Sequence, residues 1–593
     1  MRNRKTPQLH SQSEKFELSA HTESTSPELN PGRYSALGFC AVSAILLIVF
    51  ILPLRGLLRS QGPPMEEGFM LAFPELVLKG LRPNRDFLHL YGPGSLWALA
   101  GTYKTFGVSL ATERWFGALQ QAGIVISVAA IARYWGRSMS LICGVLAILF
   151  ITTPTGLVAL AWDGGVALLA LGLLALLETR RHIAGGDSPL KLAFASGILL
   201  GIALTFRLDL VLAVGLTAAT ASWGLPVKYQ KRVLMGIGVG LLPYAVHFLT
   251  AGPYVVLKGM VLDPVFNLRG GRGLPIPPPW DHLDSVLQRL GVEQLPHWPT
   301  ILSTPAQLAL WFWVLIFSVL LLLLIGALSL RRNPDRFKAR VLLSVGALGV
   351  GLLPQAIQRA DSAHLGWVSC VVLAFLPLAI CELVYLLRRD APPWVGLSSG
   401  AIIAMVIVGF VTPHYTVRIY SDYVAQSFNQ RRIAVPITHH GRLFYYGRQE
   451  VQNAAENLLA GIEVIQNPGD RLFVGTSDLR KTPYSDSYLY YLLPNLTPAT
   501  YFIEMDPGVA NRQGSGMSSD LESADIVVLS SIWQYWSEPN SSKEFGSTES
   551  SHSLADNFCL TGTFGDGIYE LYTRRPLKKV CPEGTIIPRP RGL

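Results

Sequence analysis

The sequence predicts a mainly α-helical fold in which a polytopic bundle of transmembrane helices is followed by a C-terminal α/β domain. Two observations support this prediction. Of the 593 residues, 50% are hydrophobic and only 15% are charged, whereas roughly 25% of the residues in soluble domains are charged. The apolar residues form long runs up to residue 411, after which the chain becomes polar. A chain with so few charges cannot give several soluble domains a hydrated surface, so most of it is expected to face lipid.

Eleven apolar runs are candidates for transmembrane helices, because about 20 apolar residues are needed to cross roughly 30 Å of hydrocarbon. A polar tail, residues 1–33, precedes the first run, so this run does not have the layout of a cleavable signal peptide. We expect the tail to be disordered. The predicted spans are residues 36–53, 115–132, 138–151, 156–177, 192–206, 210–223, 234–249, 308–330, 341–357, 365–387 and 395–411.

Lysine and arginine in the short loops predict the orientation of these spans, since basic loops stay in the cytoplasm. Every second short loop is basic, which places the N-terminus in the cytoplasm and residues 54–113, 250–306 and 413–593 outside it. This parity requires that the moderately apolar stretch 95–106 lies along the outer membrane surface, or dips into it, without crossing. The protein is therefore predicted to be a multi-pass protein of the plasma or inner membrane. The basic loops hold Arg133 and Arg137; Arg180 and Arg181; Lys228, Lys231 and Arg232; Arg331, Arg332, Arg336, Lys338 and Arg340; and Arg388 and Arg389.

The polar C-terminal part is predicted to be a separate α/β domain. The expected division is a cytoplasmic tail (1–33), a transmembrane domain (34–412) and an extracytoplasmic domain (413–593). An amphipathic helix is expected over 451–465. No glycine-rich phosphate loop follows the strand-like runs, so nothing indicates nucleotide binding. The predicted strands are 471–475, 500–503, 526–529 and 569–572.

The charge balance and the cysteines exclude several classes of function. The chain has 49 Lys and Arg against 40 Asp and Glu, but a basic excess favours nucleic acid only as a patch on a folded soluble face. Here the basic residues lie in loops beside apolar runs, so no nucleic-acid partner is expected. The six cysteines lack the spacing of a zinc site or a disulfide scaffold. Cys559 and Cys581 could form a disulfide if the C-terminal part lies outside the cytoplasm.

Carboxylates, arginines and histidines near the membrane gather on the predicted outer side. Charges at the edge of lipid are costly and persist mostly where they serve a cavity or a substrate. Structural alternatives stay open for each: first-turn carboxylates favoured by the helix dipole, a helix cap, a simple ion pair, or a capped turn. His247, alone on an apolar face, is expected to be a buried structural histidine. The outer-side set is Glu66, Glu67, Asp86, His89, Tyr91, Asp163, Arg207, Asp209, Gln355, Arg359, Asp361 and His364.

Taken together, these residues have the chemistry that transfer from a lipid-linked phosphate requires. A carboxylate can take a proton from an acceptor hydroxyl, and arginines can hold the anionic leaving group through bidentate contacts. The carboxylates and histidines are too scattered along the chain for a transition-metal site. An oxygen-ligated divalent cation at the acidic pair stays open as an alternative.

The first outer loop resembles that of the GT-C polytopic membrane glycosyltransferases. The resemblance rests on Glu66-Glu67-Gly68, on residues 80–87 (GLRPNRDF) and on Tyr91-Gly92-Pro93-Gly94. This superfamily includes the protein O-mannosyltransferases, the aminoarabinose transferases of lipid A and the RgtA/B/C/D-like bacterial enzymes. An acidic pair after the first span, a P-x-x-D-F-like segment, a surface-lying helix and an extracytoplasmic C-terminal domain are family features. The resemblance thus implies a GT-C-like transmembrane domain.

The resemblance implies inverting transfer of a sugar from a polyprenyl-phosphate donor to a cell-envelope glycan, lipid or protein acceptor on the outer side of the membrane. The partners it implies are that donor, the acceptor and membrane lipids, and it requires no cofactor. It assigns Glu66 as the general base and Glu67 as an orienting residue. Because the family usually has aspartate where this chain has Glu66, the assignment within the pair stays open. The resemblance implies that Asp163 matches an acidic residue of the family's second outer loop and Asp86 the aspartate of the D-F segment. With the outer-side residues, the predicted substrate-binding set is Asp86, His89, Tyr91, Asp163, Arg207, Arg359, Asp361 and His364.

Two other classes of function are compatible with the sequence. A transporter or flippase of lipid-linked intermediates would need charges near the midplane of several spans, often with paired broken helices, and here the charges gather at one face. A noncatalytic assembly or binding protein would act through its outer domain. The segment 269–280 (RGGRGLPIPPPW) is expected to be a mobile flap over the site or a plain linker.

Overall fold

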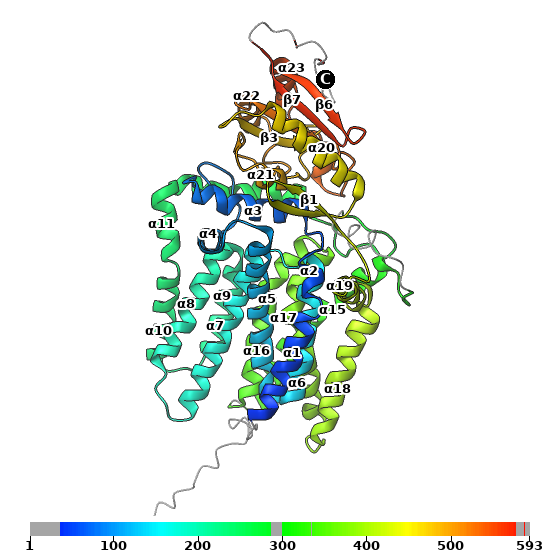
Figure 1. Cartoon of the computed structure of the whole chain (residues 1–593). Helices are drawn as coiled ribbons and strands as arrows, with labels where there is room; N and C mark the ends of the chain where they lie inside the picture. The colour runs from blue at the N-terminus through cyan, green and yellow to red at the C-terminus, as the bar shows by residue number, and fades with distance from the viewer. Residues whose placement is uncertain (1–35, 286–298, 334, 577–580, 582–585, 587–593) are drawn as a thin grey trace, which may run out of the picture.

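The computed structural model describes residues 36–285, 299–333, 335–576, 581 and 586. The predicted tail 1–33 lies outside the described residues. Figure 1 shows a bundle of long helices with a smaller α/β domain on one end. The described chain begins at the other end of the bundle, at the start of α1 (Ala36–Ile51). The predicted mainly helical architecture with a C-terminal α/β region is confirmed.

Each of the eleven predicted apolar runs contains a helix, although residues 156–160 of the run 156–177 are irregular and the helix there begins at Ala161. In the described part of the chain, nine helices are long and apolar enough to cross a membrane, and two shorter apolar helices span Leu190–Phe206 and Leu208–Ser222. The protein is therefore an integral membrane protein with many spans. The helices of the bundle are α1, α5 (Leu110–Ala132), α6 (Arg137–Thr155), α7 (Ala161–Ala184), α8 (Leu190–Phe206), α9 (Val211–Ser222), α10 (Val227–Gly240), α11 (Leu242–Ala251), α15 (Thr304–Arg332), α16 (Phe337–Gln358), α17 (Ser362–Leu387), α18 (Pro393–Val406) and η4 (Ile407–Val411).

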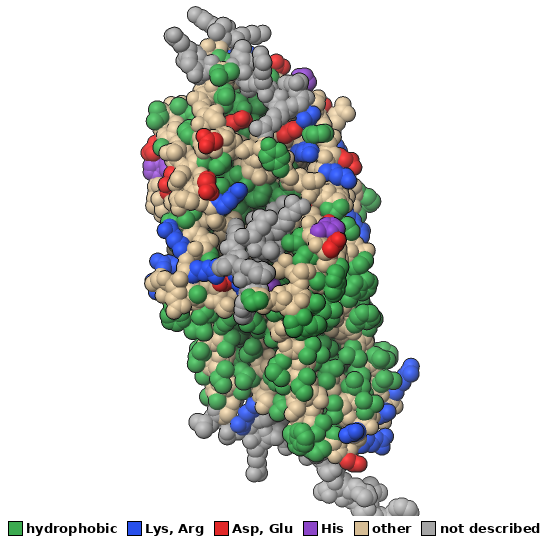
Figure 2. All heavy atoms as spheres, turned by 90° about the vertical axis from the view of Figure 1, so that its right-hand side faces the viewer, with side chains coloured by type: hydrophobic (Ala, Val, Ile, Leu, Met, Phe, Trp, Pro, Cys, Tyr) green, Lys and Arg blue, Asp and Glu red, His purple; other side chains and the backbone are tan. Residues whose placement is uncertain are grey.

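The surface of the bundle is apolar between two polar ends. Figure 2 shows hydrophobic side chains covering the lower half of the molecule, with Lys and Arg gathered at its lower end. Large apolar side chains such as Leu119, Leu324 and Leu387 are exposed there. In water such a band would be unfavourable, whereas in a bilayer it matches the hydrocarbon.

Short helices connect the bundle to the C-terminal domain. α2 (Leu54–Leu57), α3 (Pro64–Leu78) and α4 (Pro93–Phe106) follow the first span, and α3 lies across the end of the bundle beneath the C-terminal domain (Figure 1). At 14 residues, α4 is too short to span a membrane, as predicted for 95–106. The remaining connecting elements are η1 (Arg133–Trp135), η2 (Leu208–Leu210), α12 (Pro253–Leu257), η3 (Lys258–Leu268), α13 (Arg269–Arg272), η5 (His414–Arg418) and α19 (Ile419–Ser427).

The C-terminal domain is built on a five-stranded mixed sheet in the order β4-β3-β5-β7-β6. Parallel pairing joins β3 to β4 and β5, whereas β7 is antiparallel to β5 and β6. A separate hairpin, β1–β2, precedes the sheet. The elements are β1 (Val435–His439), β2 (Arg442–Tyr446), α20 (Gln449–Ile465), β3 (Arg471–Thr476), α21 (Tyr488–Leu492), β4 (Thr497–Pro498), α22 (Met517–Glu522), β5 (Ile526–Ser530), η6 (Ser541–Lys543), α23 (Glu549–Asn557), β6 (Phe558–Phe564) and β7 (Tyr569–Arg574).

Most of the predicted elements of this domain are confirmed, with one exception. The predicted strands 471–475, 526–529 and 569–572 lie within β3, β5 and β7, and the predicted helix 451–465 lies within α20. The predicted strand 500–503 is wrong, because this segment is a turn. Its backbone amides are satisfied by side chains: Tyr501 N donates to Asp520 Oδ2 at 2.8 Å and Phe502 N to Thr500 Oγ1 at 2.9 Å.

The cysteines of the C-terminal domain are paired. Cys559, at the start of β6, forms a disulfide with Cys581. Cys40, Cys143, Cys370 and Cys381 of the bundle are free thiols. The bond ties the chain that follows the last strand to the edge strand of the sheet.

Candidate active site

The acidic pair lies in the first turn of α3. Pro64 occupies the first helical position, and Glu66 and Glu67 are the acidic residues of that turn, where proline and carboxylates are both favoured. Consecutive helical residues point about 100° apart. The two carboxylates therefore face different surroundings, although they are neighbours in the sequence.

Glu67 points into the bundle and forms a closed ion pair. Arg114 Nε donates to Glu67 Oε1 at 2.7 Å and Arg114 Nη2 donates to Glu67 Oε2 at 2.9 Å. A third donor of Arg114 is bonded to the carbonyl oxygen of Leu57 at 3.1 Å. The side chains of Glu67 and Arg114 are 0% and 2% exposed. Both oxygens of Glu67 are thus committed to a buried bidentate contact.

Glu66 faces the C-terminal domain and is half-buried. The hydroxyl of Tyr484 donates a hydrogen bond to Glu66 Oε2. Burial raises the pKa of Glu66 above its usual value of 4.5, and the Tyr484 hydrogen bond and the charges of Arg272 and Arg359 offset part of that rise. Glu66 is therefore a more basic carboxylate than an exposed glutamate.

Side chains of the C-terminal domain hold it against α3 by hydrogen bonds to the backbone of that helix. Tyr484 Oη also accepts from Met65 N at 3.2 Å, and Ser487 Oγ donates to Met65 O at 2.8 Å. A Cβ added to Gly68 would lie 2.3 Å from Tyr488 N and 2.4 Å from Ser487 Oγ. Only glycine fits this approach, which gives the glycine of the Glu66-Glu67-Gly68 motif a packing role.

Arg272 and Arg359 are the arginines whose charges act on Glu66, and carboxylates of the C-terminal domain hold both. Arg359 Nη1 and Nη2 donate to the two oxygens of Glu538 at 2.8 and 2.7 Å. Arg272 Nη2 donates to Asp506 Oδ1 at 2.6 Å. Arg359 Nη1 also donates to the carbonyl oxygen of Arg272 at 2.9 Å, which links the two arginines.

Asp361 and His364 complete this network at the start of α17. Asp361 Oδ2 accepts from Arg359 Nε at 2.8 Å, while Oδ1 accepts from the backbone amide of His364 at 3.0 Å and lies 2.7 Å from its Nδ1. The positive charges of His364 and Arg359 outweigh burial and lower the pKa of Asp361 to about 2. The segment is a capped turn, and it also fixes the orientation of Arg359.

A further arginine, Arg207, makes cation–π contacts with two aromatic rings. Its guanidinium carbon is 4.5 Å from the ring centre of Tyr91 and 5.4 Å from that of Trp162. Asp209 accepts from Arg207 Nε at 2.9 Å and from Nη2 at 2.5 Å. The side chain of Asp209 is 46% exposed, so this ion pair is open to solvent, unlike that of Arg359.

The Gly-Pro-Gly turn places Tyr91 beside Arg207. A Cβ on Gly92 would lie 2.0 Å from the carbonyl oxygen of Thr205, and one on Gly94 would lie 2.3 Å from Thr205 Oγ1. The glycines therefore let the turn approach the end of α8. Burial raises the pKa of Tyr91, and the positive charge of Arg207 opposes that rise.

The other predicted residues are not gathered around Glu66. Asp163 is 0% exposed and lies in the first turn of α7, where Gln121 Nε2 is 3.4 Å from its Oδ2. Asp86 is exposed and accepts from Arg82 N at 2.7 Å, a contact that shapes the loop. His89 is buried edge-on against Phe73 and Tyr91. Burial, together with the charge of His247, lowers the pKa of His89 to about 3.

The predicted structural role of His247 agrees with its contacts. It is 1% exposed, and its Nε2 lies 2.9 Å from Asn84 Oδ1. Asn84 Nδ2 in turn donates to the carbonyl oxygen of His89 at 2.6 Å. These bonds hold the loop that follows α3.

The sequence did not point to the residues that the C-terminal domain and the segment around Arg272 contribute. Tyr484, Asp506 and Glu538 are buried, and none belongs to a recognisable motif. Arg272 lies in the segment 269–280, where α13 and the bond to Asp506 anchor it. Glu504 is 1% exposed; burial, together with the charge of Asp506, raises its pKa well above its usual value. Two carboxylates close together in a turn were the signal that could have pointed to this site.

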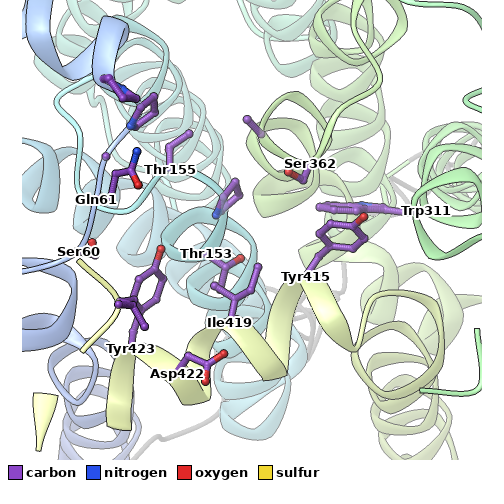
Figure 3. A pocket seen from close by; sticks show the side chains of 16 residues that line it. Ser60, Gln61, Thr153, Thr155, Trp311, Ser362, Tyr415, Ile419, Asp422 and Tyr423 are labelled. Carbon is purple, nitrogen blue, oxygen red and sulfur yellow. The ribbon is translucent and has the colours of Figure 1, made fainter. Parts of the chain in front are cut away.

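A cavity of about 110 Å³ opens next to the start of α3 (Figure 3). Its walls come from the residues preceding α3, the end of α6, the start of α17, and α15, η5 and α19. Ser362, which follows Asp361 in the chain, connects it to the arginine network. The lining residues are Ser60, Gln61, Gly62, Pro63, Pro64, Thr153, Pro154, Thr155, Trp311, Ser362, Ala363, Tyr415, Ile419, Asp422, Tyr423 and Ile433.

Comparison with known proteins finds similarity at the level of solved structures. No protein-family model and no curated protein matches the chain. The chain is structurally similar to ArnT from Cupriavidus metallidurans bound to undecaprenyl phosphate, with 12% identity, a TM-score of 0.48 and coverage of 93% of this chain and 100% of that chain. It is also similar to the oligosaccharyltransferase AglB from Archaeoglobus fulgidus in complex with an inhibitory peptide and a dolichol-phosphate, with 11% identity, a TM-score of 0.46 and coverage of 93% and 76%. ArnT and AglB are GT-C polytopic glycosyltransferases.

Proposed function

We propose that this protein is a membrane glycosyltransferase that transfers a sugar, with inversion, from a polyprenyl-phosphate donor to a cell-envelope glycan, lipid or protein acceptor. The observation that carries the proposal is the position of Glu66. This carboxylate of the GT-C-like loop lies at the junction of the bundle and the C-terminal domain, within the field of Arg272 and Arg359. Arg207 lies over the ring of Tyr91, and Glu66 is close enough to act electrostatically on Tyr91. A base and a cation for the anionic leaving group thus lie in one region, as the displacement requires.

Glu66 is the proposed general base. Its raised pKa supports this role, because a base works best when its pKa lies close to the working pH. The acceptor hydroxyl oxygen attacks the anomeric carbon and transfers its proton to Glu66. The new oxygen–carbon bond forms as the bond between the anomeric carbon and the phosphate oxygen breaks, and polyprenyl phosphate leaves with the electron pair. One displacement inverts the anomeric centre.

Arg207 is the proposed contact of the leaving phosphate. Arg359 is bonded to two carboxylates and its side chain is only 7% exposed, so freeing it would leave buried charges without partners, at a high cost. Among the described residues Arg207 has one carboxylate partner, the solvent-open Asp209, and a longer contact of 3.4 Å to Gln355 Oε1. The rings of Tyr91 and Trp162 orient it. A phosphate could replace Asp209 there with little penalty, in a bidentate geometry suited to guanidinium.

Glu67 is the proposed positioning residue of the pair. Its bond to Arg114 fixes α3 on the bundle and leaves neither oxygen for an acceptor. We therefore assign the chemistry to Glu66 and the scaffold to Glu67. The proposal requires no metal ion.

The test is sugar transfer by the purified protein in lipid vesicles, with a panel of polyprenyl-phosphate pentoses and hexoses as donors. Release of polyprenyl phosphate is measured for the wild type and for the Glu66→Gln variant. Loss of a general base lowers kcat by about 10²- to 10⁴-fold. Glu450→Gln is the matched control, since Glu450 also lies in the first turn of a helix but is exposed. Full turnover of Glu66→Gln would refute the assignment, and sugar-lipid movement across the vesicle without transfer would favour a transporter.

A further inference from the structure

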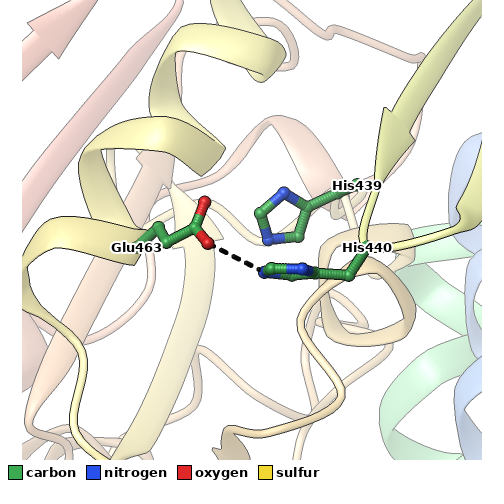
Figure 4. Close-up of side chains that lie close together, drawn as sticks. All are labelled: His439, His440 and Glu463. Carbon is green, nitrogen blue, oxygen red and sulfur yellow. Dashed lines mark ion pairs between the residues drawn. The ribbon is translucent and has the colours of Figure 1, made fainter.

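Two histidines and a glutamate converge on the outside of the C-terminal domain, away from the residues of the proposed active site. His439 ends β1, His440 is the first residue of the turn to β2, and Glu463 lies in the last turn of α20. Figure 4 shows the two imidazoles and the carboxylate pointing toward one another. One potential ligand atom from each residue lies within 4.8 Å of the others, and His440 Nε2 is 3.2 Å from Glu463 Oε1. We call these three residues the hairpin histidine site.

The backbone of the turn brings the two rings together. Consecutive residues of a strand point to opposite faces, so adjacent histidines do not ordinarily share a ligand. His440 has a φ of 46° and Gly441 a φ of 76°, the positive values that a two-residue hairpin turn requires. This turn places the ring centre of His440 4.1 Å from that of His439. Asn, Asp and His are the non-glycine residues enriched at positive φ, so His440 suits the turn as well as the site.

The donor set fits a transition metal. Two imidazole nitrogens and one carboxylate oxygen, with a fourth position left for water, form a common zinc ligand set. Imidazole nitrogen favours zinc, copper, nickel and cobalt over magnesium and calcium. His439 Nε2 is buried and has no hydrogen-bond partner in the described part of the chain. A buried nitrogen without a partner is costly, and a metal ion would satisfy it.

We propose that the hairpin histidine site binds a divalent transition metal of the zinc class. In the part of the chain that the structure describes, no other group of three or more His, Cys, Asp or Glu residues brings its ligand atoms this close together. His282 lies near Asp281 and Asp284, but these supply only one nitrogen ligand. Two nitrogens from a rigid turn and an oxygen from a helix distinguish the hairpin histidine site from such surface ion pairs.

The position of the site indicates a structural role for the metal. In the antiparallel register His439 lies opposite Arg442, and Arg442 donates to both oxygens of Glu75 on α3 at 2.7 and 3.1 Å. A metal that joins the hairpin to α20 through Glu463 would hold Arg442 against α3. The ion would thus stabilise the seating of the C-terminal domain on the bundle, and this inference does not depend on the proposed reaction.

The test is zinc binding to the full chain, purified through an affinity tag that contains no histidine. The protein is stripped with a chelator, dialysed against micromolar zinc chloride and separated from free metal, and bound zinc is measured by mass spectrometry and titration calorimetry. The ligand variants are His440→Asn, which keeps a residue suited to the turn, and Glu463→Gln. His552→Asn is the matched control, because His552 is an exposed histidine of the same domain.

The wild type and His552→Asn are expected to bind one zinc ion per chain and to unfold at a higher temperature with zinc than without it. Both ligand variants should lose affinity by more than about 10- to 100-fold, the usual cost of losing even an outer partner of a metal site, while eluting as folded protein. The proposal is overturned if the wild type binds no zinc under these conditions. It is also overturned if both ligand variants bind zinc as tightly as the control.

Discussion

The two faces of α3 carry the same side chain in opposite settings. On the bundle face, Glu67 is closed in a bidentate contact with Arg114 and is fully buried. On the face toward the C-terminal domain, Glu66 is half-buried, shares a hydrogen bond with Tyr484 and has arginines nearby without a direct ion pair. The difference teaches that a carboxylate whose charge is fully paired supports the fold, whereas one that is desolvated and incompletely paired is available for chemistry.

The largest effect on stability is expected from removing the ion pair between Glu67 and Arg114 on the bundle face of α3. Glu67→Ala leaves the buried guanidinium of Arg114 without a partner, which costs about 3–5 kcal/mol. Thermal unfolding followed by tryptophan fluorescence should show a clear fall in the midpoint, whereas Glu66→Gln should unfold close to the wild type. The double variant Glu67→Ala/Arg114→Ala should recover part of the loss, because the unpaired charge is gone. An unchanged midpoint for Glu67→Ala would contradict the buried ion pair.

One added methyl group should disturb the close contact between α3 and the C-terminal domain. In Gly68→Ala the added Cβ meets Tyr488 N and Ser487 Oγ at 2.3 and 2.4 Å, so overpacking should cost about 1–3 kcal/mol and lower activity by displacing Tyr484. Gly101→Ala is the control, because nothing lies within 4 Å of a Cβ in that helix position. If both variants unfold at the wild-type temperature, the tight approach of α3 and α21 is not present in solution.

Binding of the donor phosphate can be weakened at Arg207, its proposed contact. Arg207→Lys keeps the charge but loses the bidentate geometry, and a hydrogen bond to a charged group contributes about 1.5–3 kcal/mol. We expect kcat/KM to fall roughly 10- to 100-fold with little change in the unfolding midpoint. Arg85→Lys, a change at an exposed arginine of the loop between α3 and α4, serves as the control. Equal activity of both variants would remove Arg207 from the donor site.

The smallest expected effect is that of Tyr484→Phe, which should change the pKa of Glu66 and hence the pH dependence of the rate. The Tyr484 hydrogen bond lowers that pKa, so Tyr484→Phe raises it further. A base must be deprotonated to act, so the rate rises with pH through this pKa, and the rising limb of the pH profile should move to higher pH. The variant should therefore be slow at neutral pH and recover in alkali. A profile with an unshifted rising limb would show that Tyr484 does not act through Glu66.

Local patterns were sufficient to predict much of the fold. The eleven helical runs, the non-crossing stretch 95–106, the helix over 451–465 and three of four strands follow from hydropathy and periodicity, which depend on neighbouring residues alone. The segment 500–503 reads as a strand by composition. It is irregular because side chains satisfy its backbone amides: Thr500 bonds Phe502 N locally, and Asp520 bonds Tyr501 N from 19 positions away. No local pattern contains the second contact.

The candidate site was predictable only in part. The sequence pointed to the acidic pair and to Arg207 and Arg359, since charges near a membrane are costly and few. It did not point to Tyr484, which is 418 positions from Glu66, or to the carboxylates Asp506 and Glu538 that hold Arg272 and Arg359. These residues have an ordinary composition, and their proximity to the pair arises from the docking of the C-terminal domain.

The sequence by itself determined that this protein lies in a membrane, which runs are helical and that an acidic pair follows the first apolar run. These properties follow from transfer free energies and local backbone preferences, which act residue by residue. Only the tertiary structure decided that Glu67 is paired and Glu66 is open, and that His439, His440 and Glu463 meet. A pKa, an ion pair and a metal site depend on distance and burial in three dimensions, and distant segments of the chain set those distances.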